Sequence, residues 1–88
     1  MKIRNGFILR DVGGKTFVVA IGNLSKEFKG MITLNETGKF IWQYLSDDRT
    51  EGEIVEAIMK EYEGAEKSAI EADVNEFLTK LSSANILE

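Results

Sequence analysis

The sequence predicts a small α+β domain in which a three-stranded antiparallel sheet precedes three helices. Two observations carry this prediction. Before residue 35 the chain is rich in β-branched and aromatic residues that are punctuated by glycine, and after it the apolar residues recur at helical spacing. The chain has 88 residues, which is enough for one domain and too few for two, so residues 1–88 are expected to form a single unit.

Residues 7–10 and 16–21 have the composition of strands. The segment 11–15 joins them, and its Gly13 and Gly14 can supply the positive φ angles of a hairpin turn. Residues 29–34 predict a third strand. The second strand is apolar from Phe17 to Ile21, without alternation, so either both of its faces are covered or one face is kept for a partner.

Cap signals mark the starts of the three helices. Asn35 can cap the first helix, and Thr50 with Glu53 forms a capping box for the second. The third helix starts at residues 66–68, with Ser68 and Glu71 as a second capping box. The apolar stripes of the three helices are, in order, Phe40, Ile41, Tyr44 and Leu45; Ile54, Val55, Ile58, Met59 and Tyr62; and Ile70, Val74, Phe77, Leu78 and Leu81.

Trp42 lies off the stripe of the first helix. A tryptophan is usually largely buried, which favours packing in the core or at its boundary. Contact with a partner protein is the alternative interpretation.

The composition excludes several classes of function. The chain has neither cysteine nor histidine, so it lacks disulfides, thiol nucleophiles and the commonest metal ligand and general base. We therefore expect no enzymatic activity, no metal and no cofactor. The net charge is −4, whereas a nucleic-acid-binding domain normally has a basic face. No signal peptide and no apolar run of roughly 20 residues is present, which predicts a cytoplasmic protein without membrane contact.

The segment Leu34-Asn35-Glu36-Thr37-Gly38-Lys39-Phe40-Ile41-Trp42 resembles the "LN-x-T-G-x-x-I-W" segment of the PqqD family. The resemblance continues through residues 50–55, 72–81 and 86–88, and it is weaker over the strands. Two turns differ: Asp47-Asp48 and Asn85 stand where family members often have glycine. These differences make a paralogue that serves another peptide-modifying system at least as plausible as a member of the PQQ biosynthesis pathway.

The resemblance implies a winged helix-turn-helix-like adaptor. Such a domain binds the leader of a ribosomally synthesised precursor peptide and presents it to a modifying enzyme, usually a radical SAM enzyme. It also implies that the leader adds as a strand along the third strand and packs against the third helix. The expected peptide-binding residues are Lys29, Gly30, Met31, Ile32, Thr33, Leu34, Val74, Phe77, Leu78 and Leu81.

Physical chemistry agrees with this site, because an exposed edge strand offers unpaired amides and carbonyls to a peptide. Met31 and Thr33 share one face of the third strand and are expected to face the peptide, whereas Ile32 and Leu34 are expected in the core. Leu78 is expected to line a side-chain pocket. Lys26 and Lys29 can attract an acidic leader, although lysines that merely guard a sheet edge explain them equally well.

Two other functions fit the same elements. A winged-helix transcription regulator would read DNA with the third helix, but Glu66, Glu71, Asp73 and Glu76 on that helix would repel phosphates. An oligomerisation module would use the third strand between two copies. The sequence leaves open whether the working form is a monomer or a weak homodimer.

Overall fold

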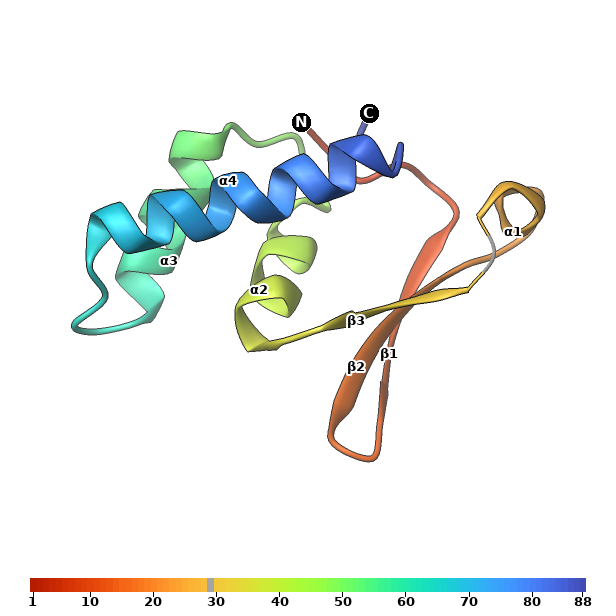
Figure 1. Cartoon of the computed structure of the whole chain (residues 1–88), viewed down its shortest axis with the longest axis horizontal. Helices are drawn as coiled ribbons and strands as arrows, with labels where there is room; N and C mark the ends of the chain where they lie inside the picture. Colours follow the sequence, from red (N-terminus) through yellow and green to blue (C-terminus); the bar gives the residue numbers. More distant parts are fainter. Residues whose placement is uncertain (29) are drawn as a thin grey trace.

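The computed structural model describes residues 1–28 and 30–88, with the longer helices packed together on one side and the sheet, with a short helix at its end, on the other (Figure 1). The elements in chain order are β1 (Phe7–Val12), β2 (Lys15–Ala20), α1 (Leu24–Glu27), β3 (Met31–Leu34), α2 (Glu36–Tyr44), α3 (Glu51–Glu61) and α4 (Lys67–Ser83). The predicted three strands and three main helices are confirmed, and α1 is an additional short helix. None of the helices in the described ranges is long and apolar enough to cross a membrane.

The strands form an antiparallel sheet in the order β1-β2-β3. The β1–β2 turn is tighter than predicted, because Val12 pairs with Lys15 and leaves only Gly13 and Gly14 between the strands. Both glycines have positive φ angles, of 58° and 79°. A turn of this kind requires positive φ at both central residues, and its twist matches that of the flanking strands.

The register of the sheet separates its two faces. Leu9 pairs with Val18 and Val18 pairs with Ile32, so these three side chains share the face that packs on the helices. Val18 is fully buried there. The opposite face carries Val19 and Met31, which do not belong to the core cluster. The core therefore covers one face of the second strand, and the interpretation that one face is kept for a partner stays a prediction.

The predicted caps of the first two main helices are confirmed. Asn35 Oδ1 accepts a hydrogen bond of 2.7 Å from the Gly38 amide at the start of α2. At the start of α3, Thr50 Oγ1 accepts from the Glu53 amide and Glu53 Oε1 accepts from the Thr50 amide. These bonds satisfy backbone donors that the first turn of a helix leaves free.

The predicted capping box of the last helix is wrong. Helix α4 begins at Lys67 with Glu66 as its N-cap, so Ser68 already lies inside the helix. The Ser68 hydroxyl donates to Glu66 Oε1 at 2.7 Å instead of capping a backbone amide. A serine acts as an N-cap only when its own backbone is extended. In this chain the extended residue before the helix is Glu66, so Ser68 cannot be the cap.

The core joins all three main helices to one face of the sheet. Its buried members are Val18, Leu34, Ile41, Trp42, Leu45, Ile54, Val55, Ile58, Val74, Leu78, Leu81 and Ile86. Trp42 is only 7% exposed and meets the Phe7 ring edge-to-face, with 5.8 Å between the centroids. Packing in the core, the favoured interpretation of Trp42, is thus the one observed.

The two ends of the chain lie side by side (Figure 1) and are bridged between Ile3 and Leu87. The turns that depart from the family pattern lie in this region. Asp48 accepts a hydrogen bond of 2.6 Å from the amino group of Met1. Asn85 has a positive φ of 61°, a conformation that asparagine tolerates and that glycine adopts freely.

Candidate functional site: the open edge of β3 and the hollows against α4

Strand β3 lies at the edge of the sheet, and among residues 1–28 and 30–88 its one partner strand is β2. The direction of its backbone groups follows from the hairpin. In a hairpin with a two-residue turn, the flanking residues Val12 and Lys15 form a hydrogen-bonded pair. Bonded and non-bonded pairs alternate along an antiparallel ladder, so the backbone groups of Val18 point away from β1 and toward its partner Ile32 in β3.

The same alternation assigns the two sides of β3. The backbone groups of Ile32 and Leu34 bond to β2, and those of Met31 and Thr33 point to the free edge. Outside the ladder, no backbone hydrogen bond is made by these four residues within the described part of the chain. The edge therefore presents two amides and two carbonyls in the pattern that another strand can pair with.

An apolar hollow of about 370 Å³ opens between β3 and the last turns of α4. We call it the apolar hollow. Its lining residues come from β3, from α4 and from the segments next to them: Phe28, Ile32, Thr33, Leu34, Asn35, Phe77, Lys80, Leu81, Ala84 and Ile86. Because Ile32 and Leu34 point their side chains into it, a strand added to the free edge would turn every second side chain toward the same space.

A close approach of α2 to α4 shapes one wall of this hollow. A Cβ atom on Gly38 would lie 3.4 Å from Phe77 Cε1 and 3.2 Å from Asn35 Oδ1. Gly38 has no positive φ, so space, and not backbone conformation, accounts for the glycine here. The missing side chain leaves room for the Phe77 ring beside the start of α2.

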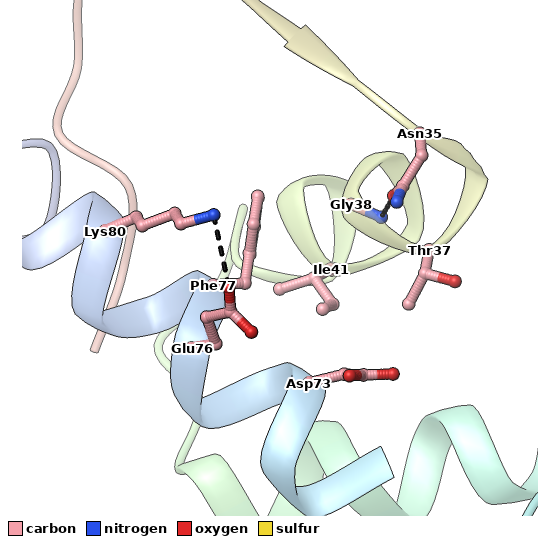
Figure 2. A pocket seen from close by; sticks show the side chains of 8 residues that line it. All are labelled: Asn35, Thr37, Gly38, Ile41, Asp73, Glu76, Phe77 and Lys80. Carbon is pink, nitrogen blue, oxygen red and sulfur yellow. Dashed lines mark hydrogen bonds and ion pairs between the residues drawn. The ribbon is translucent and has the colours of Figure 1, made fainter. Parts of the chain in front are cut away.

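A second hollow, of about 250 Å³, lies between the start of α2 and the middle of α4 (Figure 2). We call it the charged hollow. It is lined by Asn35, Thr37, Gly38, Ile41, Asp73, Glu76, Phe77 and Lys80. Asn35, Phe77 and Lys80 line both hollows, so the two lie next to each other. Lys80 Nζ pairs with Glu76 Oε1 at 3.3 Å along the helix.

The structure brings half of the predicted peptide-binding residues together. Ile32, Thr33, Leu34, Phe77 and Leu81 line the apolar hollow.

The other predicted residues lie elsewhere. Val74 and Leu78 are buried in the core, and Leu78 borders a different surface depression, beside Met1 and Leu87. The expectation that the Leu78 side chain lines the groove is therefore not met. Gly30 is exposed and lines neither hollow, and Lys29 lies outside the described residues.

The two faces of β3 are placed relative to the core as predicted. Met31 is 61% exposed on the face away from the helices, and Ile32 lines the hollow. The core and the hollow lie on the same side of the sheet, because α4 covers the core and also borders the hollow. Ile32 and Leu34 thus face the core as expected, and their face also borders the apolar hollow, whereas Met31 lies on the other face and reaches the free edge with its backbone.

Five lining residues of the apolar hollow were not predicted: Phe28, Asn35, Lys80, Ala84 and Ile86. A signal for two of them was present in the sequence. Phe77, Lys80 and Ala84 follow the three- and four-residue spacing of one helix face. That face adjoins the buried stripe of α4.

One ion pair joins β1, the strand at the opposite edge of the sheet, to α2. The Asp11 carboxylate accepts from the Thr16 hydroxyl at 2.5 Å and from Lys39 Nζ at 2.9 Å. The hydrogen bond from the Thr16 hydroxyl is the main cause, and Lys39 the second cause, of a pKa of Asp11 below its ordinary value.

The described residues contain no candidate metal site. In residues 1–28 and 30–88, no three histidine, cysteine, aspartate or glutamate side chains gather as metal ligands.

Comparison with known proteins identifies the family of the chain and a solved structure with the same fold. The family model for coenzyme PQQ synthesis protein D (PqqD) matches residues 8–87. The chain belongs to the PqqD family. The structure also matches the solved structure of TbiB1 in complex with the TbiA(beta) leader peptide, with a TM-score of 0.76 and 25% sequence identity. That match covers 100% of this chain and 95% of the other, and it confirms the α+β fold. Among curated protein sequences, none matches.

Proposed function

We propose that this PqqD-family chain binds the leader of a ribosomally synthesised precursor peptide by strand addition to β3. The observation that carries the proposal is the free edge of β3 beside the apolar hollow. Edge amides supply affinity in this mode of recognition, and pockets for alternate side chains supply specificity. The likeness to TbiB1, which was solved with a leader peptide, supports the same function.

The register specifies the pattern of the peptide. Its backbone pairs with Met31 and Thr33, so its residues opposite Ile32 and Leu34 turn their side chains toward α4. Two apolar residues separated by one residue would fill the apolar hollow, where Phe77 and Leu81 form the far wall. The residue between them points to the opposite face of the sheet and can be polar.

The chain acts in this proposal as an adaptor without catalytic activity of its own. It lacks histidine and cysteine, and the groove offers backbone groups and apolar surface, which suit binding. A separate enzyme carries out the modification, and a radical SAM enzyme is the partner that the family resemblance favours. Because ribosomes make the precursor peptide, we expect the encounter in the cytoplasm.

Selection from a displayed library of random peptides tests the binding mode. We expect the unaltered protein to enrich peptides with two apolar residues at alternate positions. Thr33→Pro removes an edge amide and leaves a peptide carbonyl unpaired, which corresponds to about a 5- to 150-fold loss of affinity for an enriched peptide.

Thr33→Ala is the matched control. It changes the same exposed side chain and keeps the amide, so we expect it to bind nearly as well as the unaltered protein. Melting curves of both variants show whether the sheet is intact. The proposal fails if no peptide is enriched, or if folded Thr33→Pro binds the enriched peptides as tightly as Thr33→Ala.

A further inference from the structure

We propose that the charged hollow is a second subsite of the peptide groove and that it takes a lysine or arginine side chain of the bound peptide. This inference rests on the proposed function, because the peptide reaches the hollow as a strand added to β3. It concerns which leaders the chain selects.

The position of the hollow along the path of the peptide is the first argument. Strand β3 ends at Leu34, and Asn35 leads directly into α2. A strand added along β3 that continues past Leu34 therefore reaches the shared boundary of the two hollows, at Asn35 and Phe77. A peptide that fills the apolar hollow with two side chains would place a third side chain, beyond the end of β3, in the charged hollow.

The charges of the hollow are the second argument. Glu76 and Lys80 compensate each other at 3.3 Å. Asp73, the third charged residue of the lining, makes no ion pair within the described ranges. The hollow thus has one uncompensated negative charge. Figure 2 shows the Asp73 carboxylate and the Thr37 side chain at the same end, away from Lys80.

The start of α2 opposes this preference, because a helix N-terminus carries roughly half a positive charge. Two features reduce its effect. The Gly38 amide already donates to Asn35 Oδ1, and Glu36 places a carboxylate in the same first turn. The full charge of Asp73 therefore outweighs the helix terminus, and a cationic guest is favoured over an anionic one.

The shape of the hollow suits a long cationic side chain. Ile41 and Phe77 contribute apolar surface, along which the methylene stem of lysine or arginine can lie while its charged end reaches the carboxylate. The Thr37 hydroxyl can accept a further hydrogen bond. Asp73→Asn removes the negative charge of the hollow. Because Asp73 is exposed, we expect this change to lower the affinity for a basic peptide only about two- to fivefold.

A charge-reversal experiment with the displayed random library tests the inference. The unaltered protein is expected to enrich lysine or arginine at a fixed distance from the apolar pair. Asp73→Lys is expected to keep the apolar pair and to enrich aspartate or glutamate at that same position. The order of the charged residue and the apolar pair in the peptides then reports the direction of the added strand.

Glu71→Lys is the matched control. It makes the same charge change on an exposed residue of α4 that lines neither hollow, and we expect it to retain the preference for lysine or arginine. An apolar pair without an accompanying basic residue would overturn the inference and leave the proposed function standing. Equal behaviour of the two charge-reversal variants would also overturn it. Failure to enrich any peptide would instead reject the proposed function.

Discussion

Two glycines in helical first turns provide a stability test of the packing that shapes the groove. Gly38 is the third residue of α2 and Gly52 the second residue of α3, and neither has a positive φ. A Cβ on Gly52 would meet only Thr50 Oγ1, at 3.9 Å. Alanine is favoured over glycine in helices, so Gly52→Ala is expected to stabilise the fold by about 0.5–1 kcal/mol.

At Gly38 the same substitution meets a crowded site. The added carbon would lie 3.2 Å from Asn35 Oδ1 and 3.4 Å from the Phe77 ring, so both must move. Overpacking of this kind costs about 1–3 kcal/mol, against a helix gain of about 1 kcal/mol. Gly38→Ala is therefore expected to be neutral or to destabilise by up to about 2 kcal/mol. A displaced Phe77 would also weaken peptide binding.

Urea denaturation of the two variants measures the contrast. With unchanged m values, the difference between the midpoints gives the difference in unfolding free energy. We expect Gly52→Ala to exceed Gly38→Ala in stability by about 1–3 kcal/mol. If Gly38→Ala gains as much stability as Gly52→Ala, Phe77 does not pack on the start of α2 and the described wall of the apolar hollow is wrong.

Two further predictions concern the sheet. Ile32→Ala is expected to lower stability by about 1–2 kcal/mol, because this side chain is partly buried, and also to weaken the peptide, whereas the exposed Met31→Ala should change neither. Melting temperatures and affinities for an enriched peptide check this, and a folded Met31→Ala that loses the peptide would reverse the assigned faces. Asp11→Asn should melt slightly below the unaltered protein near neutral pH. Thr16 and Lys39 lower the pKa of Asp11 in the folded state, so its stabilising effect is present above the unfolded pKa of about 4 and is lost as the pH falls through the folded value. Melting curves from pH 7 to about 2.5 should converge for the two proteins, and a constant difference over that range would contradict the cause given for the shift.

Local signals in the sequence predicted the parts of the fold that local chemistry determines. The adjacent glycines predicted the hairpin, and Asn35 and the Thr50–Glu53 pair predicted two helix starts. Helix α1 has only four residues, without an apolar repeat or a side-chain cap, so no local pattern distinguished it from a loop. Ser68 and Glu71 had the pattern of a cap, but the N-cap of the helix lies two residues before Ser68, at Glu66.

The site was predictable only in part, because its walls come from separate elements. Strand alternation correctly grouped Ile32 with Leu34, but it could not tell that α4 places the hollow on their side of the sheet. The helical repeat of α4 identified the buried Val74 and Leu78, whereas the neighbouring face with Lys80 and Ala84 depends on how α4 lies against β3. The helical spacing groups Lys80 and Ala84 with Phe77 on one face, but which element that face meets is a tertiary contact that neither segment reveals alone.

Amide hydrogen exchange at β3 tests strand addition most directly. In the free protein, the Ile32 and Leu34 amides bond to β2 and should exchange slowly, whereas the Met31 and Thr33 amides face the open edge and should exchange fast. Saturation with a peptide enriched from the library should slow the exchange of Met31 and Thr33 selectively. If both amides still exchange fast in the saturated complex, the peptide does not add to β3 and the account of this protein as a strand-adding leader adaptor is wrong.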